Sequence, residues 1–344
     1  MDSNMLTCMF CRKKGEILYR NLIDVFCGVK GKWDIAICRQ CGIAWRLSSS
    51  DGSQRSNFYN EYYTHRLNTE DWAFKLVSGN TNKNMPLGQR IQLALFFNDV
   101  GLSVTHSSVN PAMIRILGKS RIAHEIIRGR TCWLGSGNGK LLDIGCGSGQ
   151  FLALMRHIGW DVTGLEPDTK ACECARNRLG LNVFEGTWDA HTFERNTFDA
   201  ITGIHVIEHV EKPIDFMKQC VKLLRPGGRI VIVTPNLSGI GHRLFRASFR
   251  DIDCPRHLYL FSPSSLKAVV ECSGGRILRL FTSARHARWT WVDSTHIHCF
   301  GCFPKKVGRM TMLCGMVFQI CESYLLSLMP LLGDELIAEI TKDD

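Results

Sequence analysis

The stretch Leu141-Leu142-Asp143-Ile144-Gly145-Cys146-Gly147-Ser148-Gly149-Gln150-Phe151 joins a short apolar segment to a segment with helical spacing through a turn rich in glycine. A glycine-rich turn between a strand and a helix lets a ligand lie against the backbone and directs the first N–H groups of the helix toward it. A glycine triplet alone is weak evidence for such a site. The segments on either side of the turn therefore decide what it means.

From Lys140 onward, short apolar stretches alternate with amphipathic ones. The sequence runs KLLDIG, FLALMRHIG, DVTGLE, TKACECARNRLG, NVFEG, FDAITGIH, PIDFMKQCVKLL and RIVIVTP. Four β-α repeats of this kind predict a parallel sheet covered by helices on both faces. A helix is expected over 262–272, and strands over 276–282 and 335–341. The predicted fold is α/β, with a doubly wound Rossmann-like sheet of seven strands.

A carboxylate follows the second predicted strand. Glu166 ends the stretch Gly164-Leu165-Glu166 and lies 21 positions after Gly145, close to the offset of about 20 residues in nucleotide-binding β-α-β units. At this position a carboxylate can accept both hydroxyls of a ribose. A dinucleotide site remains open on these facts, although the turn reads G-x-G-x-G rather than the G-x-G-x-x-G of hydride-transfer enzymes.

At this point the sequence resembles a known family. LLDIGCGSGQF, GLEPD, FDAITGIHVIEHV and LLRPGGRIVIVTPN match, in order and spacing, the motifs of class I S-adenosylmethionine (SAM) dependent methyltransferases, especially their type-23 and ubiquinone-biosynthesis-like branches. The resemblance covers about 138–285. It implies that SAM is the cofactor and that the turn residues hold its methionine part, Glu166 its ribose, and the residues after strands two and three its adenine. The implied SAM-binding residues are Asp143, Gly145, Cys146, Gly147, Gly149, Glu166, Pro167, Asp168, Thr187 and His205, the last of which would border the sulfonium.

The candidate catalytic residues are His205, Glu208, His209 and His257. An alcohol is a poor nucleophile until its proton leaves, so methylation of a hydroxyl calls for a base or a metal ion. By resemblance, small-RNA 3′-end methyltransferases and some quinone-pathway relatives use an E-x-x-E-H motif with a later His or Glu to bind a divalent cation. Here His205 replaces the first glutamate, which leaves Glu208, His209 and His257 as ligands. His209 or His257 as a metal-free base, and a structural role for the Glu-His pair, remain open alternatives.

Two Cys-x-x-Cys pairs lie near the N-terminus. Cys8 and Cys11 are separated from Cys38 and Cys41 by 26 residues that include the strand-like stretch 33–37. Two such knuckles can place four thiolates around one tetrahedral Zn²⁺. We expect a zinc ribbon whose four ligands, Cys8, Cys11, Cys38 and Cys41, leave no open position, so the metal is structural.

The expected domain organisation has three parts: a zinc ribbon over 1–47, a linker and helical lid over 48–130, and the SAM-binding domain over 131–344. Within the last part, a helical insertion is expected over 286–333. Its apolar stretch 310–333 contains one charged residue, Glu322. We expect this stretch to pack as core or as a homodimer contact, or to lie on the inner membrane surface. A membrane-spanning helix is the least favoured alternative.

Charge and composition narrow the class of partner. The chain has 344 residues, of which 45% are apolar and 22% charged. This composition is typical of a globular protein and excludes a wholly disordered one. The net charge is +10. Lys and Arg outnumber Asp and Glu by 18 to 10 over 1–130 and by 12 to 4 over 242–310, but not over 131–241. Basic flanks attract anionic partners. Arg243, Arg246, Arg250 and Arg256 are expected to favour a phosphate or carboxylate on the acceptor.

The sequence therefore predicts a SAM-dependent methyltransferase with an N-terminal zinc ribbon. The resemblance of the ribbon and of 253–262 to sugar-modifying relatives favours a sugar hydroxyl or carbon as acceptor, in a nucleotide-linked or lipid-linked glycan. A quinone-like phenol and RNA gripped by the ribbon are the alternatives, and a SAM-binding module without catalysis is a further one. The start of the chain lacks a secretory signal, so a cytoplasmic location is expected, with reduced cysteines.

Overall fold

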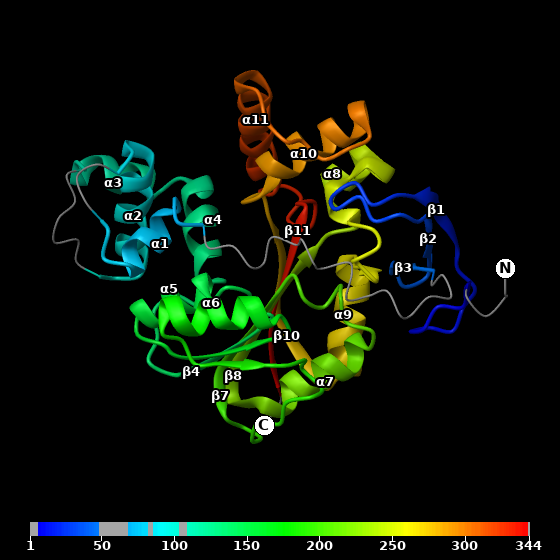
Figure 1. The fold of residues 1–344 in the computed structure, drawn as a ribbon, viewed down its shortest axis with the longest axis horizontal. Helices are drawn as coiled ribbons and strands as arrows, with labels where there is room; N and C mark the ends of the chain where they lie inside the picture. Colours follow the sequence, from blue (N-terminus) through cyan, green and yellow to red (C-terminus); the bar gives the residue numbers. More distant parts are fainter. Residues whose placement is uncertain (1–5, 48–67, 82–84, 103–108, 343–344) are drawn as a thin grey trace. The chain divides into compact units, whose positions relative to one another are not determined.

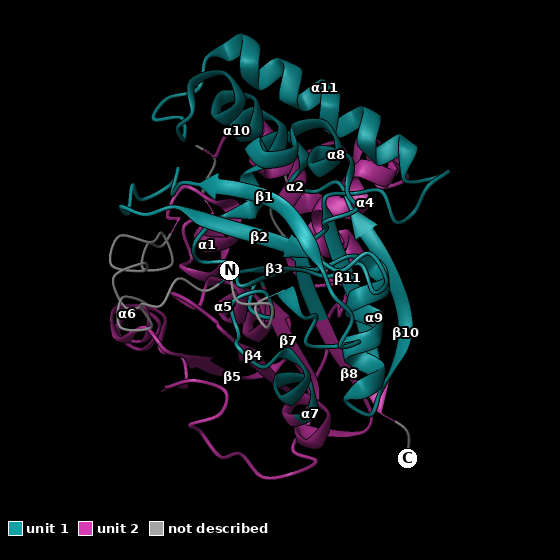
Figure 2. Cartoon of the chain, turned by 90° about the vertical axis from the view of Figure 1, so that its right-hand side faces the viewer, with its two compact units in different colours: residues 1–62, 205–218, 232–340 teal, residues 63–204, 219–231, 341–344 magenta. Residues whose placement is uncertain are grey.

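The computed structural model describes residues 6–47, 68–81, 85–102 and 109–342 (Figure 1). The polar linker predicted over 48–60 lies outside the described residues. The chain divides into two compact units (Figure 2). The first comprises 1–62, 205–218 and 232–340, and the second comprises 63–204, 219–231 and 341–344.

The predicted seven-stranded sheet is confirmed. Its strands lie in the order β10-β11-β8-β7-β4-β5-β6. Their bounds are β4 Lys140–Ile144, β5 Asp161–Glu166, β6 Val183–Glu185, β7 Phe198–Ile204, β8 Leu224–Pro235, β10 Gly275–Ser283 and β11 Glu335–Lys342. The pairs β4-β5, β4-β7 and β5-β6 are parallel, as the β-α alternation predicts. The helices between or beside these strands are α5 Gln150–His157, α6 Thr169–Leu179, α7 Pro213–Leu223 and α9 Pro263–Cys272.

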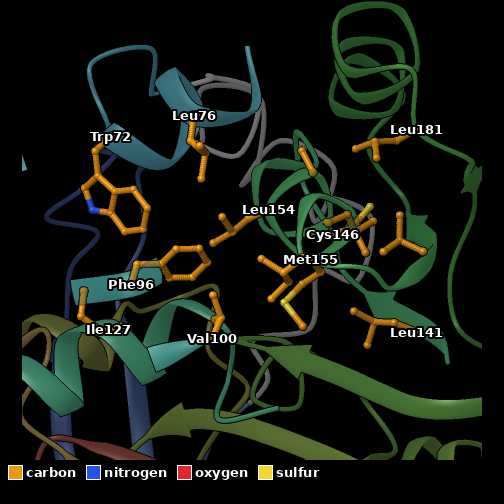
Figure 3. Packing of buried hydrophobic residues seen from close by; sticks show 14 of the residues in the cluster. Trp72, Leu76, Phe96, Val100, Ile127, Leu141, Cys146, Leu154, Met155 and Leu181 are labelled. Carbon is orange, nitrogen blue, oxygen red and sulfur yellow. The ribbon is translucent and has the colours of Figure 1, made fainter. Parts of the chain in front are cut away.

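Among the described residues of the second unit, four helices precede the sheet. They are α1 Trp72–Val77, α2 Leu87–Asp99, α3 Pro111–Leu117 and α4 Arg121–Arg130. Within the predicted helical lid, α3 ends at its C-cap Gly118, and α4 begins after its N-cap Ser120. Buried Trp72, Phe96 and Ile127 join Leu152 and Met155 of α5 in one apolar core, so the four helices pack against the α5 side of the sheet (Figure 3).

The first unit contains a small second sheet. Its strands lie in the order β1-β2-β3-β9, with bounds β1 Glu16–Leu22, β2 Trp33–Ile37, β3 Ala44–Arg46 and β9 Tyr259–Leu260. The β9 strand comes from the segment after β8 and pairs antiparallel with β3 through Ala44 opposite Leu260 and Trp45 opposite Tyr259. Trp33, Ile35, Leu237 and Phe249 belong to one buried cluster. The N-terminal strands are therefore built into the first unit.

A helical insertion separates β10 from β11, as predicted. It contains α10 Ala287–Phe300 and α11 Arg309–Leu325, while α8 Ile240–Phe245 follows β8 and is followed by one-turn helices at Arg246–Ser248 and Arg250–Ile252. The expectation that 310–333 packs as core is wrong, since most of its large apolar side chains are exposed. Across the described ranges, we find no helix that is both long enough and apolar enough to cross a bilayer.

The turn between β4 and α5 generates a stability prediction. Gly149 precedes α5 with φ = +81°, and a Cβ there would lie 2.5 Å from Leu181 Cδ1. We expect Gly149→Ala to lower the free energy of unfolding by about 1–3 kcal/mol, because alanine is strained in the left-handed backbone conformation and its Cβ makes the close contact. Denaturant unfolding measures the change.

Gly88→Ala in α2 is the matched control, since Gly88 is helical and has nothing within 4 Å of its added Cβ. It should leave the stability unchanged or raise it slightly. Equal effects of the two substitutions would contradict the assigned backbone of the turn.

Candidate functional site

The turn after β4 is shaped by three glycines. Gly145, Gly147 and Gly149 have φ values of 73°, 52° and 81°, in the left-handed region that side chains rarely adopt. Gly149 is the N-cap of α5, so the first N–H groups of that helix lack partners within the helix. The turn therefore ends on helix N–H groups, and its Gly145 and Gly147 are half-buried, an arrangement that suits a polar or anionic ligand group.

Glu166 lies beside this turn at the end of β5. Its buried carboxylate accepts hydrogen bonds from the backbone N–H of Gly147, at 2.8 Å, and of Asp168, at 3.0 Å, one on each oxygen. Each carboxylate oxygen can accept a second hydrogen bond. Glu166 is thus fixed against the glycine turn through both of its oxygens.

Asp143, in β4, is buried beneath the same turn. The Thr202 hydroxyl of β7 donates to its Oδ1 at 2.6 Å. Burial raises the pKa of Asp143 to about 7, and the nearby negative charge of Glu166 adds to the increase. The side chain can therefore act as an acceptor or as a donor near neutral pH.

The other residues implied for SAM differ in what they can offer. Cys146 is buried, and a Cβ on Gly164 would lie 2.6 Å from its sulfur, so the thiol fills the space between the turn and β5. The Asp168 side chain accepts from the Ala171 N–H at 2.7 Å and caps α6. Pro167 and Thr187 are both exposed, on the segments that follow β5 and β6.

The four cysteines of the two knuckles converge. The Sγ atoms of Cys8 and Cys41, and those of Cys11 and Cys38, lie 3.4 Å apart, and all four lie within 4.8 Å of one another. Tetrahedral zinc with Zn–S bonds of about 2.3 Å places sulfur atoms about 3.8 Å apart. The donor set and its spacing therefore fit a structural Zn²⁺.

The two knuckles have matching turns. The backbone N–H of Arg12 donates to Cys8 O at 2.9 Å, and that of Gly42 donates to Cys38 O at 2.8 Å. Both donors have positive φ, 59° for Arg12 and 71° for Gly42. The second knuckle thus uses a glycine for this conformation, whereas in the first knuckle an arginine adopts it.

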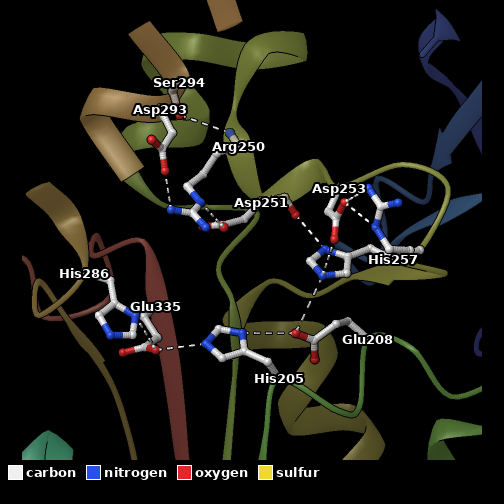
Figure 4. Close-up of polar contacts among 11 residues, drawn as sticks. His205, Glu208, Arg250, Asp251, Asp253, His257, His286, Asp293, Ser294 and Glu335 are labelled. Atoms are coloured by element: carbon white, nitrogen blue, oxygen red, sulfur yellow. Dashed lines mark hydrogen bonds and ion pairs between the residues drawn. The ribbon is translucent and has the colours of Figure 1, made fainter. Parts of the chain in front are cut away.

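His205 follows β7 directly and lies between two carboxylates of the first unit (Figure 4). Its Nδ1 is 3.2 Å from Glu208 Oε1, and its Nε2 is 3.2 Å from Glu335 Oε1. Burial would lower the pKa of His205, but the hydrogen bonds to the two carboxylates raise it to about 10. The imidazole is therefore a cation at neutral pH, which makes it unsuitable as a general base.

Glu208 is fully buried and joins this histidine to two others. Burial would raise the pKa of Glu208, but the hydrogen bond from His205 and the charge on that ring lower it to about 2. The Thr234 hydroxyl donates to its second oxygen at 3.0 Å. One ligand atom from each of Glu208, His209 and His257 lies within 4.8 Å of the others. The three residues that the E-H motif and the later histidine predicted are thus brought together.

His209 and His257 are oriented by backbone carbonyls. His209 Nδ1 lies 3.1 Å from Arg256 O, and His257 Nδ1 lies 2.7 Å from Asp251 O, so each Nδ1–H donates to a carbonyl. Burial and the neighbouring His257 ring lower the pKa of His209 to about 4, which keeps it neutral. A neutral imidazole that donates through Nδ1 carries its lone pair on Nε2, the arrangement typical of metal-binding and basic histidines.

Two of the four arginines expected to bind the acceptor are used elsewhere. Arg256 is buried and binds Asp24 at 2.7 Å and Asp253, and Arg250 binds Asp293 and lies 3.2 Å from Asp251. Arg243 and Arg246 instead line a cavity of 450 Å³ in the first unit, together with Arg39. The expectation of an acceptor-binding role is therefore wrong for Arg250 and Arg256, whose guanidinium groups stabilise buried carboxylates.

Residues 119–280 match the family model described as "Methyltransferase domain". This part of the chain is a methyltransferase domain. The glycine turn, Asp143 and Glu166 all lie inside the matched range, and so do the three clustered residues Glu208, His209 and His257.

Ubiquinone biosynthesis O-methyltransferases are among the curated relatives of the methyltransferase domain. The mitochondrial enzyme of Schizosaccharomyces pombe is 33% identical over 118 residues, which are 32% of this chain and 42% of that protein. The Vibrio cholerae enzyme is 35% identical over 104 residues, 28% of this chain and 42% of that one. The chain thus spans less than half the length of these curated relatives.

Solved structures resemble the chain more distantly. A SAM-dependent methyltransferase of Thermotoga maritima is 18% identical, with a TM-score of 0.43 over 64% of this chain and 89% of that chain. One from Archaeoglobus fulgidus is 19% identical, with a TM-score of 0.44 over 65% and 95%.

The first unit also holds polar residues that the sequence did not single out. Glu335 binds His205 and Arg285, and His286 Nδ1 lies 3.5 Å from the same carboxylate. Glu335 opens the predicted last strand, so a charged residue at the start of an apolar run was the one available signal. Its partner His205 is 130 positions away, and no local pattern links the two.

The cysteine cluster predicts a metal content. We expect purified protein to contain one zinc ion per chain, and Cys38→Ser to reduce this content and lower the melting temperature, because three thiolates hold zinc less tightly than four. Atomic absorption and thermal unfolding measure the two quantities. Cys272→Ser, at an exposed cysteine outside the cluster, is the control and should change neither. Full zinc content in Cys38→Ser protein would contradict the assignment of a zinc ribbon.

Proposed function

We propose that this protein transfers the methyl group of SAM to a hydroxyl group of a small-molecule acceptor, and that a quinone-like phenol is the favoured acceptor class. The observation that carries the proposal is the pairing of the glycine turn with Glu166 inside the methyltransferase domain. The similarity to ubiquinone biosynthesis O-methyltransferases supports an oxygen acceptor and a phenol over the sugar first expected.

The proposed SAM site uses residues with complementary chemistry. Backbone N–H groups of the turn and the Asp143 carboxyl group would hold the methionine part, and the two Glu166 oxygens would accept the ribose hydroxyls. Pro167, Asp168 and Thr187 would border the adenine through apolar and backbone contacts, because the Asp168 carboxylate already caps α6. When bound, SAM supplies a methyl group on a sulfonium, which leaves its sulfur as the acceptor oxygen forms the new bond to carbon.

The acceptor hydroxyl must lose its proton, and two routes are available at Glu208, His209 and His257. In the first, the lone pair on Nε2 of His209 or His257 takes the proton directly. In the second, the three residues hold a divalent cation, which would lower the pKa of a bound hydroxyl. Their fit to a cation rests on one buried anionic oxygen donor and two imidazoles oriented by backbone carbonyls.

His205 is assigned a positioning role in both routes. Its ring holds the Glu208 carboxylate through one nitrogen and Glu335 through the other, so it fixes the direction in which Glu208 points. The resemblance implies that His205 borders the sulfonium of SAM, and this stays a prediction.

A second acceptor class has one observation in its favour. The 450 Å³ cavity lined by Arg39, Arg243 and Arg246 also presents the hydroxyls of Tyr19 and Ser238. Guanidinium groups beside hydroxyls suit a phosphorylated sugar. An acceptor screen should therefore include nucleotide sugars as well as catechols, and should measure the SAM-dependent release of S-adenosylhomocysteine. Methylation of sugars alone would make a sugar, rather than a phenol, the favoured acceptor class.

Glu166→Ala should weaken SAM binding roughly 10- to 100-fold, since it removes charge-assisted hydrogen bonds to the ribose. Calorimetric titration of the zinc-loaded chain with SAM and, separately, with NAD measures this. Glu173→Ala, at an exposed glutamate of α6, is the matched control and should bind SAM as the unmodified protein does. Unchanged SAM affinity in Glu166→Ala would refute the assigned site, and binding of NAD alone would make the protein an oxidoreductase.

The two proton-removal routes differ in metal binding. If the cation route operates, zinc-loaded protein binds Mn²⁺, detected by electron paramagnetic resonance, and Glu208→Gln weakens this binding at least about tenfold. Mn²⁺ prefers oxygen and nitrogen donors, so it reports on this cluster rather than on the four thiolates. Glu271→Gln, on the exposed face of α9, is the control. Absence of Mn²⁺ binding together with metal-independent methylation would leave the histidine route.

A further inference from the structure

Helix α11 presents a continuous apolar stripe to solvent. Met310, Leu313, Val317, Ile320 and Tyr324 follow one another at intervals of three or four residues, so they lie on one face of the helix. All five are exposed, Met310 to 71% and Tyr324 to 65%. Leu328 and Met329 extend the stripe beyond the helix and are also exposed. Contiguous exposure of this kind marks an interaction surface, whereas single exposed apolar residues do not.

The opposite side of α11 carries polar side chains that form hydrogen bonds within the first unit. Gln319 donates to the carbonyl oxygens of Ala284, at 2.9 Å, and Arg285, at 2.7 Å. Glu322 is 1% exposed and accepts from the Asp334 N–H at 3.1 Å. The helix is therefore oriented by its polar side chains, and the reverse orientation would bury the stripe but strip Gln319 and Glu322 of these partners.

Close packing also fixes this orientation. Gly315 faces α10, where a Cβ would lie 2.8 Å from Arg288 O. The helices α10 and α11 lie side by side in Figures 1 and 2. Since a larger residue could not take the place of Gly315, this face of α11 is the one that fits against α10, and the apolar stripe faces outward.

The exposed charged side chains of 300–333 are all basic. Residues 300–333, all of which the structure describes, contain four charged side chains: Lys305, Lys306, Arg309 and Glu322. The three basic ones are exposed at the N-terminal side of α11, and Glu322 is buried. An apolar stripe beside exposed lysine and arginine matches an anionic lipid surface, where acyl chains cover the stripe and headgroups pair with the cations.

We propose that α11 docks on an anionic membrane surface, with its stripe in the interfacial region and Lys305, Lys306 and Arg309 against the lipid headgroups. Exposed aromatic rings support this occupant, because Tyr324 on α11 and Trp289 on α10 have the apolar body and polar edge that favour the membrane interface. A second copy of the chain fits less well, since 300–333 offers no exposed acidic partner for the three cations.

The test is co-sedimentation of the zinc-loaded full chain with two kinds of vesicle, phosphatidylcholine alone and phosphatidylcholine mixed with phosphatidylglycerol. We expect binding to the anionic vesicles, and at least about tenfold weaker binding for Val317→Glu, which places a charge in the stripe at an exposed position. Lys305→Glu combined with Lys306→Glu should remove the preference for anionic vesicles.

Ile116→Glu is the matched control, because Ile116 is an equally apolar residue, 71% exposed on α3. It should bind vesicles as the unmodified chain does. Absence of vesicle binding, or equal losses for Val317→Glu and Ile116→Glu, would overturn the proposal. A dimer in analytical ultracentrifugation that Val317→Glu dissociates, in a chain that ignores vesicles, would assign the stripe to a second copy instead.

Discussion

A fully buried carboxylate stays charged only if cations and hydrogen-bond donors surround it, and Glu208 imposes this constraint on the first unit. One of its oxygens is bound by His205 and the other by Thr234. His205 in turn binds Glu335, and so does Arg285, which lies two residues before the start of α10. The start of β11, the end of β8 and the segment after β7 are therefore held together by the contacts of two buried carboxylates, Glu208 and Glu335.

Buried polar groups also explain the orientation of α11. The segment that receives it ends in Asp334, whose N–H binds Glu322 and whose carboxylate accepts from the Gly241 N–H at 2.6 Å. A helix with its apolar residues turned inward would leave these groups without partners. The hydrogen bonds of Gln319 and Glu322 thus direct the polar side of α11 inward and leave its apolar stripe exposed, so hydrophobicity alone pointed to the wrong face of this helix.

Local patterns in the sequence were sufficient for the fold and for part of the site. Alternating strands and helices predict the seven-stranded sheet, and the spacing of Gly145 to Glu166 predicts two groups that meet because adjacent parallel strands end together. The paired cysteines and the Glu208-His209 pair with His257 also converge as expected. In each case a short motif or the topology of a sheet determines the neighbourhood.

The interactions that sequence reasoning missed join residues far apart in the chain. Arg256 and Asp24 are 232 positions apart, and both are charged residues that usually lie on the surface. Arg250 and Arg256 belonged to a basic segment that fitted a phosphate site equally well, and only burial assigns them to Asp293 and Asp24. No periodicity in the sequence carries this information, because it depends on which loops meet.

The Arg256 pair also gives the zinc ribbon a role in the candidate active site. Asp24 lies in the loop between β1 and β2, and its carboxylate holds the Arg256 guanidinium while the Arg256 carbonyl accepts from His209 Nδ1. Strand β9, which begins two residues after His257, is paired with β3 of the ribbon. Both histidines are therefore attached to the ribbon through the backbone of 256–259. A zinc ion held by the four cysteines would in this way support the orientation of Nε2 in His209 and His257 from outside the cluster that they form with Glu208.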